Sequence, residues 1–98
     1  MDLIYGPRGS GRTLKCFECA RANNAIIVSD YARQLKVKAK SLGFDDLEIV
    51  APYEVYDARN RNVLLHKWDE KLEEQFRFEE GAKVIGISFS DPETKEII

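Results

Sequence analysis

The feature of this sequence that most constrains its fold is a glycine-rich segment, GPRGSGRT at 6–13, between an apolar run and a helix-like segment. It fits the pattern G-x-x-x-x-G-basic-T and follows Leu3-Ile4-Tyr5 directly. Glycines let the backbone form a concave nest of inward N–H groups, and the following helix adds its own N–H groups and positive dipole end. The segment therefore predicts a phosphate-binding loop. Its candidate binding residues are Gly6, Pro7, Arg8, Gly9, Ser10, Gly11, Arg12 and Thr13.

Two positions of this loop bear on its chemistry. Arg12 stands where lysine is usual, and its planar guanidinium is bulkier than an ammonium and cannot act as a point charge on a moving phosphoryl group. Thr13 has the hydroxyl that would hold Mg²⁺ if a metal is bound. We therefore expect phosphate binding with impaired phosphoryl transfer. The alternative is a glycine-rich turn that binds nothing.

The rest of the chain alternates apolar runs with helix-period segments, which is typical of a parallel sheet covered by helices. We expect strands at 3–5, 25–28, 47–50, 63–65 and 84–89, and helices at 12–23, from Ser29 or Asp30 to Leu42, and at 67–79. Pro52 begins a short helix to 58 or a strand, and 97–98 is an edge strand or a frayed tail. The inward candidates on the helices are Leu14, Phe17, Ala20, Tyr31, Leu35, Ala39, Leu42, Trp68, Leu72 and Phe76.

Ninety-eight residues are enough for one domain, 1–98. The sequence predicts an α/β fold: a three-layer α/β/α sandwich with a mainly parallel sheet of about five strands. No apolar run approaches the length of a membrane span, and the N-terminus has no pattern of a signal peptide. We therefore expect no membrane partner and a cytoplasmic location. Cys16 and Cys19 are then expected to be structural thiols, buried or half-buried, rather than a disulfide or a metal site.

The order of these motifs resembles the first RecA-like domain of helicase-type P-loop proteins. It is most similar to the small P-loop ATPase-like proteins of bacteriophage and prophage genomes. The resemblance covers nearly the whole chain: after the loop come IIVSD at 26–30, AKSLG at 39–43, the apolar strand VLL at 63–65 and ISFS at 87–90. It implies a P-loop NTPase-like fold in which strand 84–89 lies between strands 3–5 and 63–65. It also implies ATP or another nucleoside triphosphate as ligand, in a bacterial or phage-infected cell.

The chain departs from the family at the Walker B position. After Val63-Leu64-Leu65 the usual Asp-Glu pair is replaced by His66 and Lys67. Histidine is a poor Mg²⁺ ligand, because this hard ion prefers oxygen, and a protonated lysine cannot act as a base. Asp69 is a displaced substitute, three positions on. We place His66 and Asp69 near the phosphate site, and expect protonated His66 to add a charge below its ordinary pKa.

These observations predict a nucleotide-binding or phosphate-binding protein with weak or no hydrolysis, a pseudo-ATPase whose Mg²⁺ binding is weak at most. Whether it is an enzyme stays open, and the sequence favours that it is not. One alternative is a protein-interaction module that keeps the fold without nucleotide and binds a protein partner or its own copies. A second is a single-strand nucleic-acid accessory protein. The net charge of −2 counts against it, and the basic set Arg33, Lys36, Lys38 and Lys40 then forms a solvated helix face.

Overall fold

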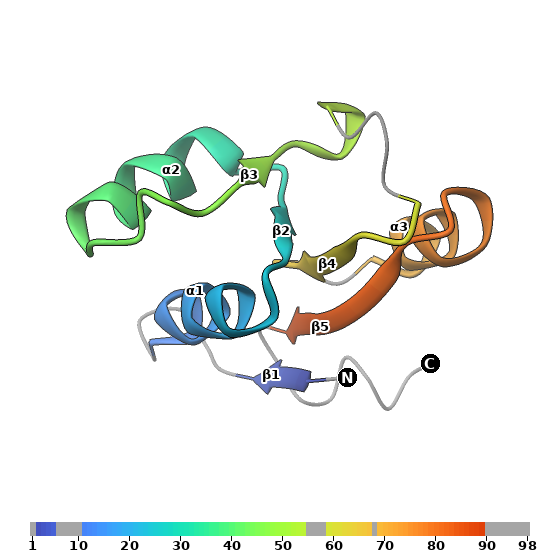
Figure 1. Cartoon of the computed structure of the whole chain (residues 1–98), viewed down its shortest axis with the longest axis horizontal. Coiled ribbons are helices and arrows are strands. Elements are labelled where there is room, and N and C mark those ends of the chain that lie inside the picture. Colours follow the sequence, from blue (N-terminus) through green and yellow to red (C-terminus); the bar gives the residue numbers. More distant parts are fainter. Residues whose placement is uncertain (1, 6–10, 55–58, 68, 90–98) are drawn as a thin grey trace.

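The computed structural model describes residues 2–5, 11–54, 59–67 and 69–89 (Figure 1). The elements in chain order are β1 (Asp2–Tyr5), α1 (Arg12–Asn23), β2 (Ile26–Val28), α2 (Ala32–Ser41), β3 (Ile49–Val50), the 3-10 helix η1 (Pro52–Glu54), β4 (Asn62–Leu65), α3 (Glu70–Glu74), the π-helix η2 (Gln75–Glu79) and β5 (Lys83–Phe89). Strands and helices alternate along most of the chain, as the sequence predicts for a sheet covered by helices.

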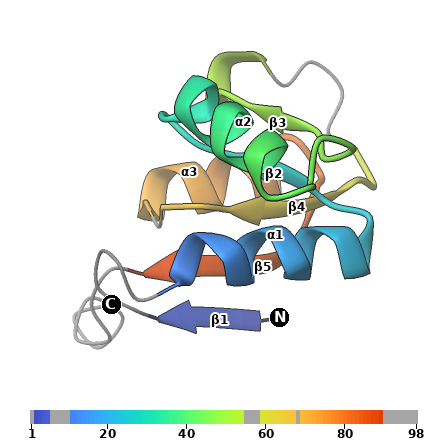
Figure 2. The ribbon, with the colours of Figure 1, turned by 90° about the vertical axis from the view of Figure 1, so that its left-hand side faces the viewer.

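The strands form one sheet in the order β1-β5-β4-β2-β3, and every neighbouring pair is parallel. β5 thus lies between β1 and β4, the arrangement that the resemblance implies. Because the strands are parallel, their carboxyl ends meet at one edge of the sheet, which we call the carboxyl edge. Their first residues meet at the opposite edge, the amino edge. In Figure 2 the arrows of β1 and β5 point to the carboxyl edge, where α1 begins.

Helices cover both faces of the sheet. α1 and α2 lie on one face, and α3 with η2 lies on the other (Figure 1). The strands supply both cores by alternation: Ile27 packs with the α1–α2 core, whereas its neighbours Ile26 and Val28 pack with the α3 core. In β4, Leu64 joins the first core and Leu65 the second. The α/β prediction is confirmed at this level, a parallel sheet with helices on both faces.

Close packing of α1 on the sheet depends on its small and aromatic inward residues. Cys16, Phe17 and Ala20 are fully buried against the strands. Gly86 in β5 makes room for this approach, at a point where the β4–β5 register shifts. A Cβ there would lie 3.2 Å from Leu64 Cδ1 and 3.4 Å from Cys19 Sγ. A glycine is therefore favoured at this position for space rather than for backbone freedom.

Several boundaries and faces differ from the sequence predictions. Leu14 is exposed, so it is not an inward residue of α1. In α2 the buried face is Ala32, Leu35 and Ala39, and Tyr31 and Leu42, which flank the helix, are half exposed. A strand is expected at 47–50, but β3 comprises only Ile49–Val50. The segment that begins at Pro52 is a 3-10 helix, η1. Segments 55–58 and 97–98 and Trp68 lie outside the described residues.

The helix expected at 67–79 begins later, at Glu70. Asp69 is the reason, because its extended backbone ends the preceding segment and its Oδ1 accepts hydrogen bonds from the N–H groups of Lys71 at 2.9 Å and Leu72 at 3.1 Å. This is an N-cap, in which a carboxylate satisfies N–H groups that have no partner in the first turn. Phe76 is buried and Leu72 is half-buried on the inward side, as predicted.

Candidate functional site

The described part of the predicted phosphate loop is its last three residues. Gly11 precedes α1 with φ 84°, a left-handed conformation that favours glycine, and Arg12 and Thr13 are half-buried in the first turn. α1 has no capping side chain and no acidic residue in this turn, in contrast to α3. The first N–H groups of such a helix attract an anion. The other predicted loop residues, Gly6, Pro7, Arg8, Gly9 and Ser10, lie outside the described residues.

Three polar side chains lie side by side at the carboxyl edge of β2, β4 and β5. Ser29, His66 and Ser88 each directly follow a residue whose side chain packs in the α3 core, so alternation directs all three to the α1–α2 face. The three are buried, with exposed fractions of 2%, 7% and 0%. We call them the polar row. It lies beneath the start of α1, on which Arg12 is located.

Ser29 links His66 to the backbone that follows β2. Ser29 Oγ accepts from the Tyr31 N–H at 3.0 Å and lies 3.2 Å from His66 Nδ1. The hydroxyl can donate its hydrogen to Nδ1, or accept from Nδ1–H with its second lone pair. When it donates, the neutral ring carries its hydrogen on Nε2, which is then a donor; when it accepts, Nε2 is an acceptor.

Two atoms of the polar row have no hydrogen-bond partner within the described part of the chain, His66 Nε2 and Ser88 Oγ. Ser88 lies beside the buried thiol of Cys16, without the geometry of a regular hydrogen bond. Burial raises the pKa of Cys16, and the nearby Ser88 hydroxyl and Arg12 charge partly offset this effect. Because buried polar atoms are almost always paired, two such atoms in one row are unusual.

Burial and nearby cations keep His66 neutral. Burial is the larger cause, followed by the charges of Arg12 and Lys38, and together they lower the pKa of His66 to about 4. The expectation that His66 is protonated just below pH 6.5 is therefore wrong for the unliganded protein. Arg12 acts on both His66 and Cys16, which shows that its guanidinium lies near the polar row.

Asp69 shares a pocket with Ser29 but not with Arg12, Thr13 or His66. The pocket, of about 300 Å³, lies at the same edge on the side of α3 and η1. It is lined by Val28, Ser29, Asp30, Pro52, Lys67, Asp69 and Leu72. Asp69 Oδ1 accepts from two N–H groups of α3, so Asp69 is a capping residue of that helix.

The donor set around the polar row does not suit Mg²⁺. This ion prefers carboxylate oxygens and water, whereas the groups near Arg12 are a neutral imidazole and hydroxyls. No group of three or more His, Cys, Asp or Glu side chains within the described ranges is arranged to hold a metal ion. Thr13, the predicted metal residue, is half-buried in the first turn of α1 at this edge. Cys16 is a buried thiol and Cys19 a half-buried one, as predicted.

Sequence reasoning gave Ser29 and Ser88 no role in the site. Ser29 was expected only as a helix cap, and Ser88 entered only through the resemblance. The signal that identifies them is their position, because each is a polar residue directly after a buried apolar position at a strand's carboxyl end. In a parallel sheet such positions on neighbouring strands lie together.

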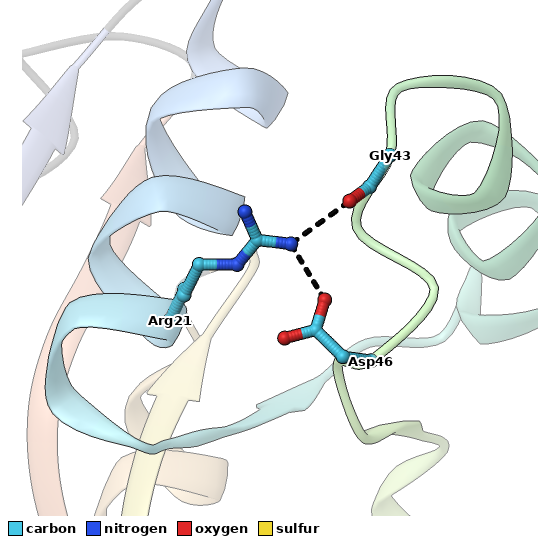
Figure 3. A network of polar contacts seen from close by, with 3 residues as sticks. All are labelled: Arg21, Gly43 and Asp46. Atoms are coloured by element: carbon cyan, nitrogen blue, oxygen red, sulfur yellow. Dashed lines mark hydrogen bonds and ion pairs between the residues drawn. The ribbon is translucent and has the colours of Figure 1, made fainter.

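The amino edge has a larger cavity, of about 350 Å³, and its charged side chains form ion pairs. Arg21 donates to the Gly43 carbonyl at 2.9 Å and to Asp46 Oδ1 at 2.6 Å (Figure 3), and its guanidinium lies 4.1 Å from the centre of the Phe44 ring. This network joins the last turn of α1 to the segment between α2 and β3. Arg61 forms a second ion pair with Glu48.

Every helix in the described ranges is too short or too polar to cross a lipid bilayer. Comparisons with protein-family models, curated proteins and solved structures found no match to this chain.

Proposed function

We propose that this chain binds the phosphate groups of an ATP-type nucleotide at the carboxyl edge and hydrolyses it weakly or not at all. The observation that carries the proposal is the polar row beneath the uncapped start of α1, with two atoms, His66 Nε2 and Ser88 Oγ, that have no partner among the described residues. An anion at this position would accept from both, and its charge would interact with Arg12 and the N-terminus of α1. This supports the P-loop interpretation of segment 6–13.

The same residues argue against efficient hydrolysis. The Walker B acids are replaced by neutral His66 and exposed Lys67, and Asp69 is engaged as a helix cap. A general base must lie within hydrogen-bond reach of the attacking water in a basic form. We propose the His66 tautomer in which Ser29 donates to Nδ1 and Nε2 carries the hydrogen, because an anion in the site would accept from Nε2–H. In that tautomer His66 is a donor to phosphate rather than a base.

The proposal is tested by calorimetric titration with ATP, ADP and inorganic phosphate, in Mg²⁺ and in EDTA. We expect nucleotide affinity to be nearly equal in both, because Arg12 supplies by charge-assisted hydrogen bonds part of what Mg²⁺ usually provides. Arg12→Gln should weaken binding at least about tenfold, equivalent to the loss of one charge-assisted bond. The control is Arg59→Gln, on an exposed side chain before β4.

Gly11→Val should also reduce binding, through backbone strain at its positive φ rather than through a clash with described atoms.

In a phosphate-release assay turnover should equal background. ATP binding at least ten times tighter in Mg²⁺ would contradict metal-independent binding. If no ligand binds at millimolar concentration, the protein-interaction alternative is favoured instead.

A further inference from the structure

Two exposed helix faces on opposite sides of the sheet have opposite charge. Segment 31–43, which contains α2, has four basic residues and no acidic one. Segment 69–80, which contains α3 and η2, has six acidic and two basic residues. Figure 1 shows α2 and α3 on opposite faces of the sheet, so the two surfaces cannot meet within one molecule.

Each face also has an exposed apolar side chain among its charges. On α2, Arg33, Lys36, Val37 and Lys40 are exposed and lie at helical spacings of three and four, opposite the buried Leu35, and we call them the basic face. Val37 is 69% exposed. A helix face with this pattern suits a partner that is acidic and has an apolar group at its centre.

The second face has that composition. Glu70, Glu74, Phe78 and Glu79 are exposed on the outward side of α3 and η2, and we call them the acidic face. Phe78 is 80% exposed, although a phenylalanine is among the side chains that gain most from burial. Contact of Phe78 with Val37 of a neighbour would remove both from water while the charges around them pair.

We propose that copies of this chain associate head to tail, the basic face of one on the acidic face of the next. Charge complementarity favours this pairing and opposes the symmetric ones, because two basic faces or two acidic faces repel each other. A pairing between two different faces leaves one face of each kind open, so further copies can add. A polyanion such as nucleic acid is less suited to the basic face, because Val37 is central to it and the chain's net charge is −2. The proposal is independent of the phosphate site.

The test is sedimentation velocity of the full chain over a range of concentrations, at low and high salt. We expect concentration-dependent association that weakens at least tenfold between about 50 and 500 mM salt. Val37→Glu sets an acidic side chain against the partner's acidic face, and Phe78→Lys sets a basic one against the partner's basic face, so each variant should be a monomer. Both positions are exposed, so the fold should persist, which circular dichroism checks. Tyr53→Glu, at an 83% exposed side chain outside both faces, should associate like the wild type.

Mixing the two variants gives the decisive result. The Val37→Glu chain keeps its acidic face and the Phe78→Lys chain keeps its basic face, so the mixture should associate although neither variant does so alone. A mixture that stays monomeric overturns the proposal, as does a wild type that is monomeric at low salt. Binding of a labelled single-stranded oligonucleotide by a monomeric wild type would assign the basic face to nucleic acid instead.

Discussion

The two edges of the sheet use polar side chains in opposite ways. At the amino edge, Arg21 has three partners, a carbonyl, a carboxylate and an aromatic ring, around a cavity open to water. At the carboxyl edge, His66 and Ser88 are more deeply buried, and each has one polar atom without a partner in the part of the chain that the structure describes. The larger cavity is thus at the edge whose polar groups hold the fold together. The unpartnered groups are at the other edge.

This difference separates a stabilising role from a binding role. A paired group lowers the free energy of the folded state, whereas a buried unpaired one raises it. Sites that bind ligands commonly retain such a cost because the ligand offsets it. On this interpretation, removing a paired group at the amino edge reduces stability without affecting phosphate binding, and removing an unpaired group at the carboxyl edge weakens phosphate binding without reducing stability.

The largest expected effect is the pH dependence of stability caused by His66. Its pKa is about 4 in the folded chain and about 6.5 when unfolded. Between these values the unfolded chain binds a proton that the folded chain does not, so the free energy of unfolding falls as the pH falls from 6.5 to 4. The total is at most about 3 kcal/mol.

His66→Asn isolates this contribution in denaturant titrations at several pH values, because an amide can keep the contact with Ser29 but does not titrate. As the pH is lowered from 6.5 to 4, the unfolding free energy of the wild type should fall relative to that of the variant. Parallel profiles would show that His66 is not buried as a neutral group.

The sequence predicted the fold well where periodicity and turn residues agree. α1 occupies the predicted residues 12–23, and β5 lies between β1 and β4 as the resemblance implies. The sequence did not predict the π-helix η2 or the late start of α3. The helical period at 67–79 favours a start at Lys67, whereas Asp69 as an N-cap favours a start at Glu70, and the structure shows the second. Tyr31 and Leu42 share the helical spacing of the buried face of α2, so the sequence predicted that they point inward. They lie at the margin of that face and are half exposed, whereas the small residues Ala32 and Ala39 are buried.

The candidate site was predicted less completely. The sequence identified Arg12, Thr13 and His66, but it gave His66 an ordinary pKa, since desolvation depends on packing that no local pattern encodes. Ser88 is nine positions after the end of the last predicted helix and 22 after His66, yet parallel pairing places it beside the same strand end. Asp69 was assigned to the site by distance in sequence, whereas its carboxylate points back to its own helix.

At the amino edge, Arg21→Met should lower the free energy of unfolding by about 1–2 kcal/mol, through loss of the bond to the Gly43 carbonyl and of the contact with Phe44. Nucleotide affinity should not change, because Arg21 lies at the far end of α1. Chemical denaturation and calorimetric titration check the two halves. Lys83→Met, at an exposed side chain that begins β5 at the same edge, is the control and should change neither. A loss of nucleotide affinity in Arg21→Met would place a ligand in the amino-edge cavity and reverse the comparison.

The smallest effect distinguishes the two buried serines of the polar row. Ser29 is partnered by Tyr31 N–H and His66 Nδ1, so Ser29→Ala should lower the free energy of unfolding by about 1 kcal/mol. Ser88 Oγ has no partner of regular geometry among the described residues, so Ser88→Ala should leave stability unchanged or raise it by about 0.5 kcal/mol. The same Ser88→Ala variant should bind phosphate about tenfold more weakly, because the anion loses one donor. Thermal melts of both variants, with and without ATP, measure the two effects together. If Ser88→Ala destabilises the chain as much as Ser29→Ala does, the Ser88 hydroxyl has a hydrogen-bond partner in the folded state, and the Cys16 thiol is the candidate. The carboxyl edge would then have one unpaired group rather than two.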